Sequence, residues 1–166
     1  MKTAFIIIDV QNILVETGFE TEKLLEKIAY LQEQARKQQI EIIYMQHIET
    51  PEALTSEDWQ LSPLLNRQEN EKVFQKRYNS MFKETGLKEY LDQQGIEHLV
   101  LCGMQTEYCV DTSVKVGFEY GYKLIIPEGV VTTFDGEDIP AETLNEFYEN
   151  IWAERFADVL DYKSIF

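Results

Sequence analysis

The sequence predicts an α/β fold: a single-domain, doubly wound, three-layer sandwich with a mainly parallel sheet of five to six strands. Short apolar segments alternate with amphipathic ones along the 166 residues, which is typical of a parallel sheet with helices on both faces. Several of the apolar segments are continuous, as expected of strands buried on both sides. The length suits one domain spanning residues 1–166.

The first half of the chain supplies two clear strands and one helix. Residues 4–8 are entirely apolar and predict a buried strand. Residues 21–38 place their apolar side chains on one helical face, and residues 40–45 form the second strand. Residues 49–69 contain two prolines and many polar residues, so we expect a long, partly irregular excursion, the kind of loop that is often functional.

The second half continues the alternation of strands and helices, with glycines and prolines at several of the boundaries. The expected elements are a weak strand at 72–75, a helix at 86–94, a strand at 99–101, a helix from 106 to 121, a strand at 122–126, a loop or short strand at 130–134, a helix at 140–157 and a closing strand at 159–160.

Composition excludes several classes of partner. The formal net charge is −15, from 15 Lys and Arg against 30 Asp and Glu, and such a field repels nucleic acid and anionic membranes. No apolar run approaches the length of a membrane span, and no leader segment precedes the first strand. Two cysteines do not suggest a disulfide framework. We therefore expect a cytoplasmic protein without nucleic-acid or membrane partners.

Cys109 is the first candidate for chemistry, because it follows a buried strand at the start of a predicted helix. Thr106 is expected to cap that helix, which places Cys109 in the first turn. Exposed N–H groups at a helix start favour a thiolate over a thiol and can hold an oxyanion. A lone cysteine is more often a small packing residue, so this position needs support from other residues.

Asp9 and Lys76 provide that support. Asp9 follows the first strand, Lys76 the third, and Cys109 lies just past the fourth. In open α/β sheets the carboxyl ends of the strands form one ligand-binding edge. Each charged residue alone is equally well explained as a strand terminator, but together the three form a base, a cation and a nucleophile, the set that acyl transfer needs.

Three segments carry a resemblance to a known family. They are IDVQN at 8–12, KRYNSMF at 76–82 and GMQTEYCVDT at 103–112. They resemble the signatures of the isochorismatase-like cysteine hydrolases, a superfamily with a Rossmann-like fold that includes nicotinamidases, N-carbamoylsarcosine amidohydrolase, ureidoacrylate amidohydrolase and isochorismatase. The resemblance runs from about residue 4 to residue 135, and the tail from Phe156 is similar to the family's final strand.

The resemblance implies a catalytic triad of Cys109, Asp9 and Lys76. Asp9 would take the thiol proton, and Lys76 would stabilise the thiolate while the sulfur attacks a carbonyl carbon. The resemblance also places the oxyanion hole at the backbone N–H groups of Gln105 and Cys109. It implies a cis peptide bond between Met104 and Gln105.

The sequence departs from the nicotinamidases of this family, which bind a metal through histidines after the second strand. Here that place holds only His47, and His98 lies at the start of the fourth strand. Zinc needs at least three protein ligands, so we expect no metal. No glycine-rich nucleotide motif is present, and we expect no cofactor. Ile13 and Leu14 replace an acidic–aromatic pair, which also weighs against nicotinamide.

The expected substrate is a small molecule bound at the same edge of the sheet. Six side chains are candidates for its pocket, although each aromatic one is more often a packing residue: Gln11, Leu14, His47, Trp59, Tyr78 and Tyr108. The last predicted helix carries more apolar side chains than one face needs, so we also expect a homo-oligomer, a dimer or higher.

The leading hypothesis is a metal-independent amidohydrolase of a small amide or carbamoyl compound, acting through a thioester. Isochorismate-type ether hydrolysis does not use a cysteine nucleophile, so Cys109 argues against it. A second class is a redox-responsive or small-molecule-binding protein with a reactive Cys109. Cys102 lies on the buried strand and is poorly placed to resolve an oxidised Cys109. An intact set of Asp9, Lys76 and Cys109 disfavours an inactive relative.

Overall fold

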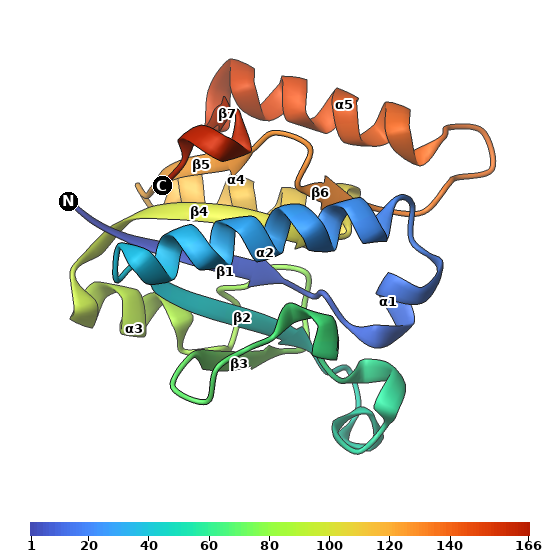
Figure 1. Ribbon diagram of the computed structural model, residues 1–166, viewed down its shortest axis with the longest axis horizontal. Coiled ribbons are helices and arrows are strands. Elements are labelled where there is room, and N and C mark those ends of the chain that lie inside the picture. Colours follow the sequence, from blue (N-terminus) through green and yellow to red (C-terminus); the bar gives the residue numbers. More distant parts are fainter.

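A parallel sheet runs through the centre of the computed structural model, which describes residues 1–166 (Figure 1). The strand order is β3-β2-β1-β4-β5-β7, and β6 pairs with the end of β4. The strands are β1 (Lys2–Ile8), β2 (Glu41–His47), β3 (Lys72–Lys76), β4 (Ile96–Met104), β5 (Lys123–Pro127), β6 (Val131–Thr132) and β7 (Asp158–Leu160). Every pairing between these strands is parallel. The predicted fold class is confirmed, with seven strands in place of five to six.

Helices cover both faces of the sheet. They are α1 (Asn12–Thr17), α2 (Thr21–Lys37), α3 (Leu87–Gln94), α4 (Asp111–Glu119) and α5 (Ala141–Ile151). The long helix α2 lies across one face, and α3 and α4 lie on the other (Figure 1). The sequence did not predict the short helix α1.

Strand β1 divides the core into two clusters because alternate side chains point to opposite faces. Phe5 and Ile7 pack with Leu24, Ile28 and other residues of α2. The remaining apolar side chains of β1, which are Ala4, Ile6 and Ile8, pack with residues of α3 and α4. All five strand residues are fully buried, which confirms that the continuous apolar run marks a strand covered on both sides.

Strand β4 is longer than the sequence predicted, and it continues through Gly103. This glycine has a φ of +121°, and a Cβ built on it would lie 2.1 Å from the carbonyl oxygen of Ile8. Only glycine allows the ends of β1 and β4 to approach this closely. Gly103 therefore brings the segment with Cys109 directly beside the segment with Asp9.

The last helix differs from the prediction over residues 140–157, because α5 passes into a π-helical turn at Trp152–Phe156. Trp152 is fully buried in the core, and Tyr148, Ile151 and Phe156 pack against it. Phe147 alone among these side chains is mostly exposed, at 57%. Most of the apolar surface of this segment is thus covered within the chain, and self-association stays a prediction.

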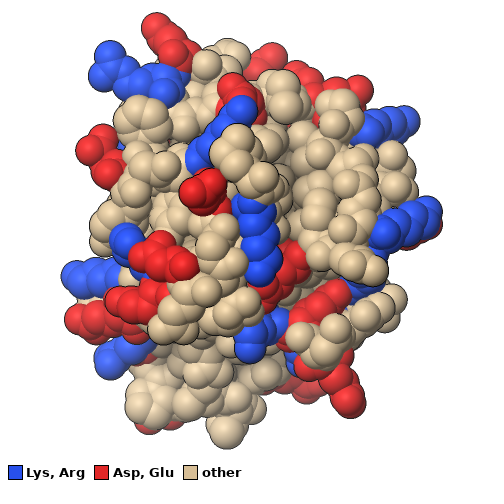
Figure 2. Space-filling view, turned by 90° about the vertical axis from the view of Figure 1, so that its left-hand side faces the viewer, with Lys and Arg blue, Asp and Glu red and all other residues tan.

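The face at the N-terminal ends of the strands carries acidic and basic side chains intermixed over its surface (Figure 2). No helix of the structure is long and apolar enough to cross a membrane. The opposite edge, at the C-terminal ends of β1, β2, β3 and β4, holds the candidate catalytic side chains.

Candidate active site

The structure brings Asp9, Lys76 and Cys109 together at the C-terminal edge of the sheet. Lys76 is the last residue of β3, and Asp9 directly follows β1. Lys76 Nζ lies 2.9 Å from Asp9 Oδ2 and 3.1 Å from Cys109 Sγ. All three side chains are buried, so their charges interact through protein with little screening by water.

The Lys76 amino group lies at the centre of this cluster. Besides Asp9 and Cys109, it contacts the backbone oxygen of Tyr78 at 2.9 Å and Nδ1 of His47 at 3.1 Å. An ammonium group has three hydrogens to donate, and here it faces four acceptors. The lysine is therefore fully engaged inside the site and has no hydrogen free for a ligand.

Cys109 lies in a π-helical turn over Thr106–Val110 that precedes α4. The turn is closed by a hydrogen bond of 3.2 Å from the N–H of Val110 to the carbonyl of Gln105. The expectation that Thr106 caps an α-helix is wrong. Thr106 lies inside the turn, and its hydroxyl donates to Asn145 of α5 at 2.6 Å. π-Helical turns are rare and are often found at functional sites.

Burial raises the pKa of the Cys109 thiol to about 12, and the neighbouring charge of Asp9 also raises it, while Lys76 lowers it. Burial therefore opposes the thiolate that was expected from the helix start. A buried thiol of this kind needs a base to become a nucleophile.

Asp9 is placed to be that base. Its backbone has a φ of +51°, a left-handed conformation that aspartate tolerates better than most residues. One carboxylate oxygen pairs with Lys76, while Oδ1 is buried and has no hydrogen-bond partner. Burial also raises the pKa of Asp9 above its ordinary value, against the opposing effect of Lys76. A more basic carboxylate with a free oxygen is suited to accept a proton.

Gln105 lines the same pocket at the start of the π-helical turn. The peptide bond between Met104 and Gln105 is cis, in the place that the resemblance implied. The carbonyl of Gln105 accepts the N–H groups of Tyr108 and Val110, whereas no backbone carbonyl accepts the N–H of Gln105. This N–H is thus available to a ligand beside Cys109.

A pocket of about 210 Å³ opens above Cys109. The residues that line it are Asp9, Leu14, His47, Glu49, Trp59, Asn79, Gln105, Tyr108 and Cys109. Leu14, His47, Trp59 and Tyr108 were predicted from the sequence. Glu49 and Asn79 were not, although Asn79 lies in the KRYNSMF segment that carries the family resemblance; the sequence context of Glu49 is that of an ordinary polar loop residue. Asn79 accepts a weak hydrogen bond of 3.7 Å from Cys109 Sγ.

Gln11 and Tyr78 do not line this pocket, so these two predictions are wrong. Gln11 is fully buried, and its amide nitrogen donates to the carbonyls of His47 and Trp59 at 3.0 and 2.7 Å. Its amide oxygen accepts the N–H of His47 at 2.9 Å. Tyr78 directs its ring toward Lys83, whose Nζ lies 3.9 Å from the ring centroid. Gln11 thus holds the main chain of two pocket residues, His47 and Trp59, but does not line the pocket itself.

The structure contains one group of side chains that could hold a metal ion, and the sequence did not predict this group. A carboxylate oxygen of Asp9, a ring nitrogen of His47 and Cys109 Sγ all lie within 4.8 Å of one another, so three potential ligands do meet. Lys76 Nζ, however, lies within 3.1 Å of each of these three side chains. The lysine occupies the position that a cation would need, and a bound metal would have to displace it.

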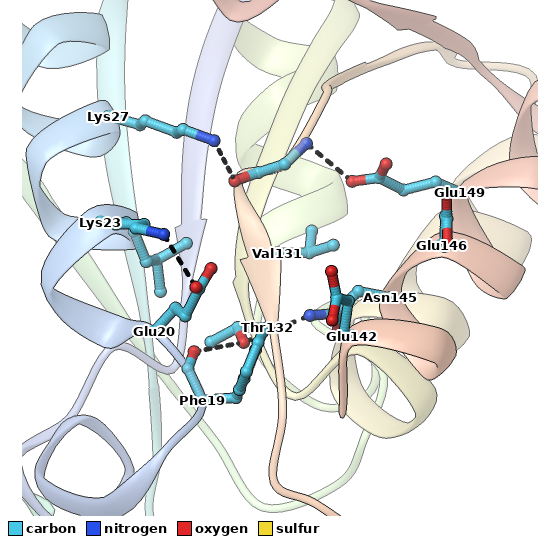
Figure 3. Close-up of a pocket in the computed structure, with 12 residues that line it drawn as sticks. Phe19, Glu20, Lys23, Lys27, Val131, Thr132, Glu142, Asn145, Glu146 and Glu149 are labelled. Carbon is cyan, nitrogen blue, oxygen red and sulfur yellow. Dashed lines mark hydrogen bonds and ion pairs between the residues drawn. The ribbon is translucent and has the colours of Figure 1, made fainter. Parts of the chain in front are cut away.

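A second cavity, of about 230 Å³, lies between α2 and α5 beside β6 (Figure 3). Lys27 of α2 donates to the carbonyl of Gly129 at 3.1 Å, and Glu149 of α5 accepts the N–H of the same glycine at 2.8 Å. The cavity contains no cysteine or histidine, and none of the three candidate catalytic side chains lines it. Lys27 and Glu149 hold the turn at Gly129 between the two helices.

Known proteins resemble this chain over nearly its whole length. A family model described as the isochorismatase domain matches residues 3–163. An isochorismatase from Pseudomonas putida KT2440 has a similar structure, with a TM-score of 0.92, 29% identity, and coverage of 99% of this chain and 90% of that chain.

Two relatives of this chain are named for an enzymatic activity. Streptothricin hydrolase of Streptomyces noursei is 28% identical over 144 residues, which cover 83% of this chain and 51% of that protein. The chain thus spans about half the length of this relative. Ureidoacrylate amidohydrolase of Klebsiella pneumoniae is 38% identical over 71 residues, which cover 43% of this chain and 30% of that protein.

Proposed function

This chain belongs to the isochorismatase family of hydrolases, and we propose that it cleaves a small amide or carbamoyl compound through a thioester on Cys109. One observation carries the proposal. The buried thiol, the Lys76 amino group and the Asp9 carboxylate form a connected cluster, with 3.1 Å between Sγ and Nζ and 2.9 Å between Nζ and Oδ2. The pocket above them has room for a small molecule.

In the first half of the reaction, Asp9 Oδ1 takes the proton of Cys109 as the sulfur attacks the carbonyl carbon of the substrate. The C–S bond forms, and the carbonyl oxygen becomes an oxyanion. Because the pKa of Asp9 is raised, it lies closer to the pKa of Cys109. The free-energy cost of moving the proton from sulfur to the carboxylate is therefore smaller. Lys76 stabilises the negative charge as it moves from the carboxylate to the sulfur.

The N–H groups of Gln105 and Cys109 are the proposed oxyanion hole. The free N–H of Gln105 beside the pocket supports this role. Asp9 then gives its proton to the leaving nitrogen, so the C–N bond breaks and ammonia or an amine departs. In the second half Asp9 takes a proton from water, hydroxide cleaves the C–S bond, and the proton returns to the sulfur.

The proposed reaction needs no metal, because Lys76 supplies the positive charge at the position that a metal ion would take. A redox-sensing role is less well supported. A sensor thiol needs a low pKa, whereas that of Cys109 is raised to about 12. Cys102 is fully buried in β4, which leaves no accessible partner for an oxidised Cys109.

The test is ammonia release from a panel of small amides, ureido acids and carbamoyl amino acids, with and without a chelator. Wild type is compared with Cys109→Ala, and Cys102→Ala is the matched control because it removes the other free cysteine. We expect turnover by wild type and by the control, no turnover by Cys109→Ala, and an acyl adduct on the Cys109 peptide by mass spectrometry. Turnover that persists in Cys109→Ala would overturn the proposal.

A further inference from the structure

The charges and aromatic rings of the pocket point to a class of substrate. We propose that the pocket selects amides carrying a positively charged group, which is held by Glu49 and the ring of Trp59. The word substrate assumes the hydrolysis proposed above, and nothing else in this inference depends on it. The charge preference of the pocket itself is a separate property and has its own test.

No lysine or arginine lines the pocket. Its charged lining residues are Asp9 and Glu49, and Asp9 is neutralised by its pair with Lys76 below the pocket floor. The lysine has no hydrogen left to donate to a ligand, because its four acceptors already exceed its three hydrogens. A substrate carboxylate would therefore find no cationic partner, and it would meet the charge of Glu49.

Glu49 is placed to receive a cation. Its side chain is 70% exposed at the pocket mouth, and Oε1 lies 3.3 Å from Nε2 of His47. An ammonium group can only donate, so the 3.1 Å contact with Lys76 assigns Nδ1 of His47 as an acceptor. This tautomer leaves the ring hydrogen on Nε2, which faces Glu49. This contact directs the carboxylate toward the pocket while Oε2 remains free for a ligand.

Two aromatic rings extend the same surface. Trp59 lies against His47, with 6.1 Å between the ring centroids, and Tyr108, which also lines the pocket, is 55% exposed. A cation over the face of an indole or phenol ring is attracted by the ring quadrupole. A carboxylate next to the exposed ring of Tyr108 and the partly buried ring of Trp59 is a combination that suits an ammonium group better than a neutral or anionic one.

The charge of the whole protein acts in the same direction. The formal net charge of −15 attracts cations and repels anions over the approach to the pocket, and this attraction weakens as salt increases.

The direct test is alkylation of Cys109 by small reagents that differ in charge: 2-bromoethylamine, iodoacetamide and iodoacetate. Each rate is measured in wild type, Glu49→Gln, Glu49→Lys and Glu52→Gln, and is expressed relative to iodoacetamide with the same variant. Glu52 is an exposed acid of the same loop that does not line the pocket, so Glu52→Gln is the control for net charge.

In Glu49→Gln we expect the relative rate with bromoethylamine to fall about two- to fivefold and that with iodoacetate to rise, as for an exposed charge pair. Glu49→Lys should reverse the preference, and Glu52→Gln should leave both ratios near those of wild type. Unchanged ratios in Glu49→Gln, or equal changes in Glu52→Gln, would overturn the proposal.

A second arm measures kcat/KM for amides of equal length whose far end is an ammonium, a methyl or a carboxylate group. We expect the ammonium compound to be preferred, and a preference for the carboxylate would overturn the inference. If no amide is hydrolysed but the alkylation ratios shift as expected, the hydrolase function fails and the cation-selective pocket stands. If amides are hydrolysed but neither arm shows a preference for the cationic compound, the cation-selective pocket is refuted and the hydrolase function stands.

Discussion

The amino group of Lys76 lies 3.1 Å from Nδ1 of His47, and this contact links the catalytic cluster to the pocket wall. Lys76 has more acceptors than hydrogens, so the acceptors compete for it. A thiolate accepts a hydrogen bond more strongly than a thiol. When Cys109 loses its proton, we therefore expect the lysine to bond more strongly to sulfur at the expense of its other three acceptors, one of which is His47. Because His47 also contacts Glu49, ionisation of Cys109 is expected to affect the pocket wall.

Replacing Asp9 with Asn should separate thiol acidity from catalysis. The negative charge of Asp9 helps to raise the pKa of Cys109, so Asp9→Asn should lower that pKa and increase the thiolate fraction at a given pH. Hydrolysis should nevertheless fall about 10²- to 10⁴-fold, because the general base is lost. The thiolate is titrated by its ultraviolet absorbance, with Cys109→Ala as the blank. Hydrolysis that rises together with the thiolate fraction would show that Asp9 is not the base.

The pH dependence of kcat/KM should reflect the raised pKa of Asp9. Burial favours the neutral carboxyl group, and a protonated Asp9 cannot take the thiol proton. Activity should therefore fall as pH decreases through a value above about 4, the ordinary range of an aspartate. A rate profile measured over the range in which the protein stays folded checks this. An acid limb at or below the ordinary aspartate range would contradict the assignment.

The buried pair of Lys76 and Asp9 should show strong coupling in stability. Lys76→Met leaves the Asp9 carboxylate buried without a partner, which costs about 3–5 kcal/mol. The double variant Asp9→Asn/Lys76→Met removes both charges and should recover much of that loss, while activity stays absent. Denaturant unfolding of the two single variants and the double variant measures the coupling. Additive effects would mean that the pair does not interact as the 2.9 Å contact indicates.

Zinc should compete with Lys76. Asp9, His47 and Cys109 offer three ligand atoms within 4.8 Å of one another, but the ammonium group lies among them and repels a cation. Chelators should leave the wild type active, and Lys76→Met should bind Zn²⁺ more tightly than wild type, as measured by equilibrium dialysis. His47→Ala in the same background removes one ligand and should abolish the gain. Stoichiometric zinc in the wild type, with activity lost on its removal, would contradict this expectation.

Glu71 should stabilise the protein in a pH-dependent way. Burial alone would raise its pKa, but hydrogen bonds from Arg36, Gln68 and Tyr44 lower it below the ordinary value. A lowered pKa means that the stabilisation is present above the pKa of the unfolded chain and is lost as pH falls. Glu71→Gln should cost about 1–3 kcal/mol near pH 7. In urea unfolding the difference from wild type should shrink toward pH 4, and a constant difference would refute the charge-based explanation.

The sequence predicts the positions of Asp9, Lys76 and Cys109 well because they depend on topology alone. Residues that follow parallel strands must meet at one edge, whatever the details of the loops. The form of the turn around Cys109 was missed for a physical reason: the same apolar spacing fits a π-helical turn and the first turn of an α-helix. The hydrogen bond from Thr106 to Asn145 is a tertiary contact of this turn that the apolar spacing does not encode.

Pocket residues were harder to predict, because each depends on where a loop side chain points. Gln11 follows a strand, as a ligand-binding residue would, but its amide is used entirely by the main chain of His47 and Trp59. Glu49 enters the pocket through its contact with His47, and Asn79 through its position beside Cys109. The contact of Asn79 with Cys109 joins residues 30 positions apart, whereas Glu49 and His47 are close in the sequence and meet only because of the conformation of their loop.

Gln11 also has a consequence for how this protein can change over evolution. Its side chain holds the loop after β2 through main-chain atoms only, namely the N–H and carbonyl of His47 and the carbonyl of Trp59. Every amino acid except proline supplies those atoms, so replacing the side chains at positions 47 and 59 leaves the hydrogen bonds from Gln11 to the loop in place. New specificities can therefore be acquired, or engineered, by side-chain replacement in this loop without moving the nucleophile.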